Sequence, residues 1–180
     1  MSFKLVLTIV ALAAAAVLAT SSHAQQSAAA AAANPLDNVP DKMPFDIPYG
    51  APVSLARAET LIGVAVTEAH KHDWKLVVAV VDSGGNLVAL QRMDGAQLAS
   101  ISVAEHKARA SAQYRRETKV FESGIQEKGN LYVMTLDGMI GSRGGIPLVE
   151  NGKLIGAIGC SGGTGAQDEV ACKAAVATIK

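Results

Sequence analysis

Apolar residues recur at helical spacing through residues 55–70 and predict the first helix of a folded domain. Ser54 stands immediately before this stretch and is its candidate N-cap. Residues 74–81 form a nearly continuous, valine-rich apolar run, which is typical of a strand covered on both faces. Turn-forming residues follow at 82–86, so residues 87–92 are expected to return as a second, antiparallel strand.

Three more elements are predicted in the middle of the chain. Ser100 or Ser102 caps a second helix that runs to about residue 116. Its buried stripe consists of small residues, which let a helix lie close to a sheet: Ala104, Ala108, Ser111 and Ala112. Residues 118–126 predict another short helix, and residues 131–135 predict a third strand.

The clearest local signal lies between Gly144 and Gly163. Residues 146–150 and 153–159 are strand-like and are joined by Asn151-Gly152, a pair that favours the type I′ turn of a hairpin. Thr164 and Gln167 then fit a capping box that opens the last helix. Consecutive strands joined by tight turns predict an α+β domain, a five-stranded antiparallel sheet with helices packed on it.

The first residues predict export. Residues 1–24 have the basic start, the short apolar segment and the small residues before a cleavage site that define a secretory signal peptide. An uncleaved N-terminal anchor is the alternative, although the apolar segment is short for a membrane helix. Residues 25–48 are rich in Ala and Pro and are expected to be a flexible linker, and residues 49–180 a single domain. We therefore expect a periplasmic or secreted protein without a membrane span after cleavage.

Composition and cysteine content narrow the partners and the chemistry. The chain has 16 Lys plus Arg and 16 Asp plus Glu without a basic stripe, so no nucleic-acid partner is expected. In an exported chain, Cys160 and Cys172 can form a disulfide or remain two buried thiols, and both alternatives stay open. A metal pair is disfavoured, because no histidine or second cysteine pair is spaced with them.

A glycine-lined cleft is the first candidate binding site. Gly144, Gly145 and Gly162 stand at strand ends, where a missing side chain lets a ligand or another backbone come close. Ser161 opens a glycine-rich segment that leads into the last helix. Backbone N–H groups at a helix N-terminus suit an anion, although a tight turn followed by a cap explains the same residues.

Basic residues near this cleft are candidate clamps for a carboxylate. Arg92 ends a predicted strand and is followed by Met93 and Asp94, and Lys107 and Arg109 lie on the second helix. The alternative is a local Arg92–Asp94 pair and a solvated helix face.

Histidines are the candidate metal ligands. His106 lies on the second helix and is the candidate axial ligand of a haem iron, a role that one histidine can fill. His70 and His72 flank the end of the first helix, where a capping role is the main interpretation. Met93, Met134 and Tyr114 are weaker ligand candidates, and Met134 is expected in the core. Residues 159–163 match the letters of a nucleophile elbow, but no histidine follows them, so a hydrolase is not expected.

Several short motifs point to a known family in combination. They are Val-Val-Asp-Ser-Gly-Gly-Asn-Leu at 80–87, Arg-Met-Asp-Gly-Ala at 92–96, Lys-Ala at 107–108, Gly-Gly-Ile-Pro at 144–147, Ile-Gly-Ala-Ile-Gly-Cys-Ser-Gly at 155–162 and Asp-Glu at 168–169. Together they resemble the GlcG/HbpS family, also called the haem-degrading or haem-binding domain, which is similar to the C-terminal domain of PduO-type proteins. The resemblance covers nearly all of residues 53–180.

This resemblance implies a profilin-like α/β/α arrangement and a homo-oligomer. It also implies haem or corrinoid-related binding in some members, and redox or iron roles outside the cytoplasm in others, without a settled enzyme chemistry. The chain departs from the family pattern at Cys160, where valine is usual, and the pattern does not demand a histidine at any position that has one here.

Two functions are therefore predicted. The first is an exported haem-binding, haem-sensing or haem-degrading protein with a pocket at a subunit interface, in which Arg92 or Lys107 meets a propionate and His106 binds the iron. The alternative is an enzyme or accessory subunit for a small organic acid, with Lys107 or Asp94 in proton transfer. Its carboxylate site would consist of Arg92, Asp94, Lys107, Gly144, Gly145 and Ser161. A structural oligomer without a ligand is a third interpretation.

Overall fold

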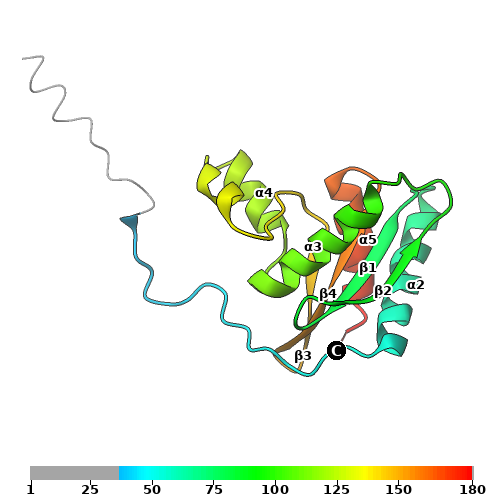
Figure 1. Ribbon diagram of the computed structural model, residues 1–180, viewed down its shortest axis with the longest axis horizontal. Coiled ribbons are helices and arrows are strands. Elements are labelled where there is room, and N and C mark those ends of the chain that lie inside the picture. Colours follow the sequence, from blue (N-terminus) through cyan, green and yellow to red (C-terminus); the bar gives the residue numbers. More distant parts are fainter. Residues whose placement is uncertain (1–36, 180) are drawn as a thin grey trace, which may run out of the picture. The chain divides into compact units, whose positions relative to one another are not determined.

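The computed structural model describes residues 37–179, so the predicted signal peptide lies outside the described residues. A four-stranded sheet in the order β2-β1-β4-β3, with every neighbouring pair antiparallel, forms the centre of the domain (Figure 1). The strands are β1 (Val77–Asp82), β2 (Leu87–Arg92), β3 (Gly145–Glu150) and β4 (Lys153–Ser161). The predicted class and the two predicted strand pairings, β1 with β2 and β3 with β4, are confirmed.

Helices cover both faces of the sheet and make three layers (Figure 1). Helices α2 (Leu55–Lys71) and α5 (Gly165–Val176) pack on one face, and α3 (Ser100–Tyr114) packs on the other. A short helix, α4 (Lys119–Gln126), and a 3₁₀ turn, η2 (Leu131–Thr135), connect α3 to β3. The buried side chains of β1 alternate between the two faces: Val78 and Val80 meet the α2/α5 side, and Val77 and Ala79 meet α3. This alternation explains why the whole strand reads as apolar.

Small residues let α3 lie directly on the sheet. Ala104, Ala108 and Ala112 are fully buried on its inner face. A Cβ at Gly159 of β4 would overlap the carbonyl oxygen of Ala104, so this position excludes any side chain. The stripe of small residues predicted for this helix is therefore confirmed.

Local signals fixed the hairpin and two helix starts. Asn151 and Gly152 have φ values of 49° and 72°, as a type I′ turn requires. The Ser54 side chain accepts a hydrogen bond from the Arg57 N–H, and Thr164 and Gln167 form a complete capping box. The cap predicted for the second helix is wrong, because the N-cap of α3 is Ala99 and makes no side-chain hydrogen bond.

The prediction of a fifth strand is wrong. Residues Leu131–Thr135 form the 3₁₀ turn η2, in which only Val133 is buried, so no alternating face is available to join the sheet. Met134, expected in the core, is 56% exposed. A five-residue apolar run is too short for its period to separate a strand from a helical turn.

Residues from Pro44 onward belong to one compact unit. Leu154 donates its N–H to the Pro48 carbonyl at 2.8 Å, and Gly50 donates to the Leu154 carbonyl at 2.7 Å. We call residues 44–50 the arm. Its end therefore pairs with β4 as an additional short bridge. No helix among residues 37–179 is long and apolar enough to cross a membrane.

The two edge strands of the sheet differ in how their outer backbone groups are covered. At the β3 edge, Thr118 donates its N–H to the Gly145 carbonyl and accepts the Gly145 N–H on its hydroxyl, both at 3.0 Å. Pro147, in the middle of β3, has no N–H to donate. Strand β2 forms the opposite edge, and within the described sheet it pairs with β1 alone.

A disulfide ties the last helix to the sheet. Cys160 of β4 and Cys172 of α5 are joined, with their Cα atoms 5.8 Å apart, and both residues are fully buried. The alternative of two free thiols is therefore wrong. The bond closes the connection between β4 and α5 on the α2/α5 face of the sheet.

We expect the disulfide to contribute ~3 kcal/mol to the free energy of unfolding. Its cysteines are 12 residues apart in the sequence, and closing a loop of about 15 residues in the unfolded chain is worth roughly that much. Urea unfolding of the oxidised protein and of a Cys160→Ala/Cys172→Ala double variant measures the difference. A reductant should lower the unfolding midpoint of the parent chain and leave that of the double variant unchanged. An equal response of both proteins would contradict the assignment.

Candidate functional site

A pocket at the end of β2 gathers three of the predicted site residues. It encloses about 410 Å³ and is lined by Val66, His70, Lys75, Gln91, Arg92, Met93 and Asp94. We call it the β2-end pocket. Because β1 and β2 are antiparallel with Val77 opposite Arg92, the end of β2 lies beside the segment that leads from α2 into β1. The last turn of α2 therefore adds His70, and the connection to β1 adds Lys75.

Backbone and sulfur contacts hold the end of β2 in place. The Met93 N–H donates to the Leu76 carbonyl at 3.0 Å, and the Leu76 N–H donates to the Met93 Sδ at 3.4 Å. Met93 is buried, while Arg92 and Asp94 on either side of it are exposed. Gly95 then turns the chain with a φ of 80°. The base of the pocket is therefore buried and hydrogen-bonded, and the charged side chains around it are exposed.

Two polar side chains of this pocket have no partner among the described residues. Within residues 37–179, neither the His70 ring nor the Arg92 guanidinium has a hydrogen bond or an ion pair, and Lys75 pairs only with Asp73. The local Arg92–Asp94 pair considered from the sequence is not formed. An open imidazole with two nearby cations can bind a metal-containing or carboxylate ligand.

The other two described histidines are engaged elsewhere. His106 of α3 is half-buried, and its Nε2 lies 3.2 Å from the Gly138 carbonyl oxygen. His72 stacks on Trp74 with ring centroids 4.4 Å apart, and its Nε2 lies 3.4 Å from a Glu68 oxygen. His106 is not among the residues of the β2-end pocket, so the structure does not bring it together with Arg92.

The remaining predicted site residues form a buried cluster in the protein interior. Lys107 is 1% exposed, and its Nζ donates to Asp168 at 2.7 Å and to the Cys160 carbonyl at 3.2 Å. The Ser161 hydroxyl bonds the Ser100 hydroxyl at 3.1 Å, also in a buried position. Lys107 therefore has no open face toward a ligand, and Arg92 is the one cation of the predicted organic-acid site that is exposed.

Close backbone packing explains the glycines of this cluster. A Cβ at Gly145 would overlap the Lys107 carbonyl, and one at Gly162 would overlap the Lys75 carbonyl. A Cβ at Gly144 would lie 2.9 Å from both the Asp168 Cβ and the Cys160 carbonyl oxygen. Protein atoms thus fill the space that was expected to be a cleft. No buried side-chain nitrogen or oxygen in the described part of the chain lacks a hydrogen-bond partner that a ligand would have to supply.

The pair of Lys107 and Asp168 joins three elements. Burial raises the pKa of the Asp168 carboxyl, while the Lys107 ammonium and the Gly163 N–H, 3.0 Å from its second oxygen, act in the opposite direction. Through these bonds α3, β4 and the first turn of α5 meet at one point. The motif residues Lys107 and Asp168 are thus two halves of one interaction, which no sequence spacing indicated.

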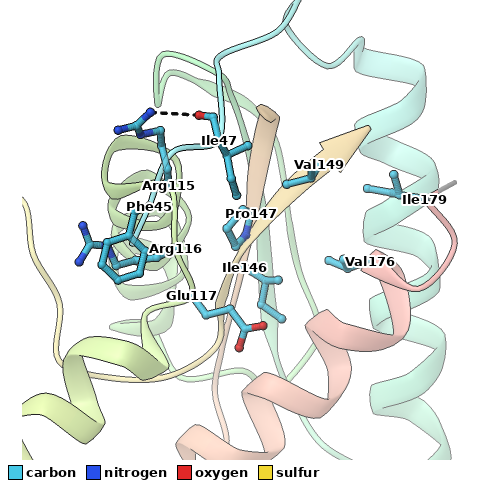
Figure 2. Close-up of a pocket in the computed structure, with 10 residues that line it drawn as sticks. All are labelled: Phe45, Ile47, Arg115, Arg116, Glu117, Ile146, Pro147, Val149, Val176 and Ile179. Atoms are coloured by element: carbon cyan, nitrogen blue, oxygen red, sulfur yellow. Dashed lines mark hydrogen bonds between the residues drawn. The ribbon is translucent and has the colours of Figure 1, made fainter. Parts of the chain in front are cut away.

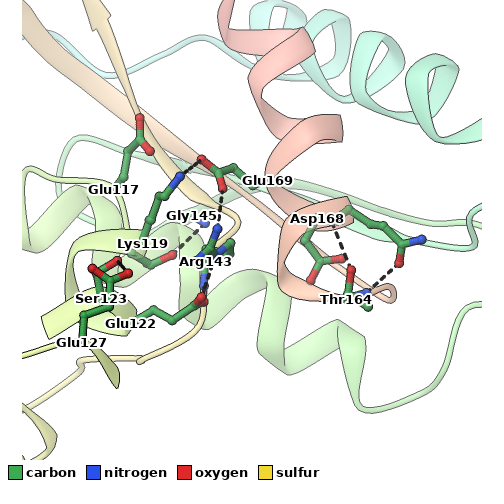
Figure 3. A network of polar contacts seen from close by, with 12 residues as sticks. Glu117, Lys119, Glu122, Ser123, Glu127, Arg143, Gly145, Thr164, Asp168 and Glu169 are labelled. Atoms are coloured by element: carbon green, nitrogen blue, oxygen red, sulfur yellow. Dashed lines mark hydrogen bonds and ion pairs between the residues drawn. The ribbon is translucent and has the colours of Figure 1, made fainter. Parts of the chain in front are cut away.

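A second polar network surrounds Glu169 (Figure 3). Glu169 of α5 pairs with Lys119 of α4 at 3.3 Å, with Arg143 at 3.5 Å and with Lys173. Arg143 also pairs with Glu122 at 2.6 Å. The network therefore connects α4 and the segment before β3 to the helix α5.

A second pocket was not anticipated from the sequence. It encloses about 450 Å³ between the arm, β3 and the end of α5, and two arginines stand among mostly apolar side chains (Figure 2). Within the described residues, no group of three or more His, Cys, Asp or Glu side chains is placed to hold a metal ion.

Comparison with known proteins gives one consistent family. The family model described as haem degrading protein HbpS-like matches residues 53–177. Protein GlcG of Escherichia coli (strain K12) is 39% identical over 109 residues, which are 61% of this chain and 81% of that protein.

Solved structures agree with the sequence matches. A double mutant of HbpS from Streptomyces reticuli is similar with a TM-score of 0.67 and 25% identity, over 83% of this chain and 99% of that chain. The structure of PduOC in complex with haem is similar with a TM-score of 0.65 and 28% identity, over 72% of this chain and 96% of that chain.

Replacing Lys107 with alanine should destabilise the fold by ~3–5 kcal/mol, because it leaves the Asp168 carboxylate buried without a cation. A Lys107→Met/Asp168→Leu double variant removes both charges and should lose less stability than the single variant. Chemical unfolding of the three proteins measures this. A loss below about 1 kcal/mol for Lys107→Ala, as an exposed pair would give, would contradict the structural role.

Acid should weaken the Glu169 network. Burial disfavours the charged carboxylate, but hydrogen bonds from Lys173 and Lys119 outweigh it and lower the pKa of Glu169. The unfolded chain therefore binds this proton more tightly, so the network stabilises the fold above the ordinary glutamate pKa of 4.5 and loses this effect as the pH falls through the lowered folded value.

A Glu169→Gln variant should lose roughly 1.5–3 kcal/mol at pH 7 and less at pH 3. Unfolding midpoints of this variant and the parent chain between pH 7 and pH 3 measure the convergence. Glu59→Gln, at an exposed position of α2, is the matched control and should follow the parent curve. Parallel curves for Glu169→Gln and the parent would rule out this contribution.

Proposed function

The chain belongs to the HbpS-like family of haem-degrading proteins, and we propose that it is an exported haem-binding protein whose haem site is the β2-end pocket. Family membership and the likeness to a haem-bound PduOC support haem as the ligand. The observation that carries the location is the pairing of a free imidazole, His70, with a free guanidinium, Arg92, in one pocket.

The residues of this pocket fit the chemistry of the group. His70 would bind the iron through a ring nitrogen, the commonest axial ligation. Arg92 and Lys75 would each donate hydrogen bonds to a propionate carboxylate. Val66 and Met93 would contact the porphyrin face. When bound, haem would supply a redox-active iron, and the protein would bind and orient it.

This assignment changes the first choice of axial ligand from His106 to His70. The His106 Nε2 faces the Gly138 carbonyl oxygen, so iron binding at this atom would break an existing contact. His70 loses nothing by binding, because its ring has no partner in residues 37–179. The β2-end pocket is also open, so a second copy of the chain covering it would shield the porphyrin from water. This supports assembly into a homo-oligomer as part of the proposal.

Export is supported by two independent features. The signal-peptide pattern of residues 1–24 predicts translocation. The Cys160–Cys172 disulfide belongs to an oxidising compartment, because cytosolic thiols are kept reduced. Expression of the full chain in a Gram-negative host followed by fractionation and N-terminal sequencing tests this. A mature protein that begins at Gln25 is expected, and a full-length cytoplasmic product would contradict export.

The haem assignment is tested by titrating the purified protein with hemin and following the Soret band. We expect saturable binding, at least tenfold weaker binding and a shifted band for His70→Ala, and an unchanged titration for His72→Ala. His72 is the matched control because it lies in the same helix end but stacks on Trp74. Arg92→Gln should weaken binding about tenfold, the effect of one charge-assisted hydrogen bond of ~1.4 kcal/mol.

The opposite pattern is equally informative. If His106→Ala abolishes the Soret shift and His70→Ala leaves it unchanged, the axial ligand is His106 and the β2-end pocket is not the site. If the parent chain does not shift the band beyond a non-binding protein, the haem function itself is wrong.

A further inference from the structure

We propose that the second pocket is a separate binding site for a small amphipathic carboxylate, an alkanoate of medium length. We call it the arm pocket. It is lined by Phe45, Ile47, Arg115, Arg116, Glu117, Ile146, Pro147, Val149, Val176 and Ile179 (Figure 2). It shares no residue with the β2-end pocket, and its volume of about 450 Å³ is in the range of small-molecule sites.

Apolar side chains form most of the wall. Ile47 of the arm, Val149 of β3 and Ile179 after α5 come from three separate segments and line the same pocket (Figure 2). The only carboxylate of the lining is Glu117, and it pairs with Lys173 at 3.5 Å. The pocket therefore offers an apolar body and a positive side.

Arg116 is a cation without a counter-charge. Its guanidinium carbon lies 3.3 Å from the centre of the Phe45 ring, 5.4 Å from that of Phe121 and 5.8 Å from that of Tyr114. Its Nε donates to the Tyr114 carbonyl at 3.0 Å, and neither terminal nitrogen bonds another group of residues 37–179. No carboxylate in that range lies within 4 Å of it.

This surrounding leaves the guanidinium partly desolvated. Burial lowers the pKa of Arg116, and the neighbouring Arg115 charge adds to the effect. Aromatic faces compensate a cation only in part, whereas a bound carboxylate would add charge-assisted hydrogen bonds to the two terminal nitrogens. The missing partner of Arg116 is thus an anion that can also occupy an apolar space.

Arg115 holds the arm as one wall of the pocket. Its Nη1 donates to the Ile47 carbonyl at 3.1 Å, and its guanidinium lies over the Tyr49 ring at 5.6 Å. Arg115 is also the C-cap of α3 with a φ of 54°, a left-handed conformation that usually belongs to glycine. The Arg115 side chain thus contacts the arm directly beside Arg116, although its backbone has a conformation that favours glycine.

Octanoate, octanol and acetate are the probes. Calorimetric titration of the purified protein should give saturable binding of octanoate, at least tenfold tighter than that of octanol, because only octanoate has a charge for Arg116. Acetate should not bind measurably, because it lacks the apolar body. From hexanoate to octanoate, each added methylene should tighten binding about fourfold.

Variants assign the site. Arg116→Gln should weaken octanoate binding at least tenfold, and Arg109→Gln should not change it, because Arg109 lies outside the pocket and pairs with Glu105. Arg115→Gly removes the contact with the arm at a position where glycine is comfortable, and it should weaken binding without loss of the fold. If Arg116→Gln does not fold, methyl NMR of the parent chain replaces it: octanoate should shift Ile146 and Ile179 and leave the core residue Ile62 unmoved.

Several results would overturn the proposal. They are absence of saturable octanoate binding, equal affinities for octanol and octanoate, unchanged binding in Arg116→Gln, or octanoate shifts confined to methyl groups outside the arm pocket. A hemin titration of Arg116→Gln completes the set. Unchanged hemin binding supports two separate sites, whereas a tenfold loss would make the arm pocket part of the haem site and end the proposal of a separate one.

Discussion

The arrangement of the whole domain depends on the buried ion pair of Lys107 and Asp168. A charged pair without access to water is tolerated only where other bonds complete it, and here the Cys160 carbonyl and the Gly163 N–H do so. Since the four groups come from α3, β4, the first turn of α5 and the connection before it, the pair ties both helices to the sheet from opposite sides. Nearby, the Cys160–Cys172 bond holds the middle of α5 to the same strand.

This tight centre determines where pockets can form in the described domain. Glycines at 145 and 159 bring the α3 backbone onto the strands, so no room remains between the layers. The open pockets lie instead at the periphery, where the end of β2 meets α2 and where the arm passes β3. The close packing of α3 on the sheet thus both fills the interior and leaves the pockets at the periphery. The groups that could hold a haem or a carboxylate are therefore surface groups fixed by a stiff support.

Local chemistry made much of the fold predictable from the sequence. The Asn151-Gly152 turn, the Thr164 capping box and the valine-rich β1 each depend on neighbouring residues, and the structure has all three. Leu131–Thr135 was assigned wrongly as a strand, because all its apolar residues except Val133 face outward in a 3₁₀ turn. The candidate site was harder to predict from the sequence than the fold. From the sequence, Lys107 looks like any lysine on a helix surface until its distant partner Asp168 is known. Arg92 and His70 line the same pocket because the pairing of β1 with β2 places the end of β2 near the end of α2. The predicted hairpin contained this pairing, but the position of α2 beside it was not predicted.

The unequal edges of the sheet limit how copies of this chain can join. Thr118 occupies both backbone groups of Gly145, and Pro147 offers no N–H, so the β3 edge cannot accept another strand there. Strand β2 is the edge of the described sheet that has no such obstruction. A molecule with one open edge can pair once, in a twofold contact that consumes the edge of both copies. In such a pair the obstructed β3 edges would lie outermost, where Thr118 and Pro147 disfavour the addition of further strands.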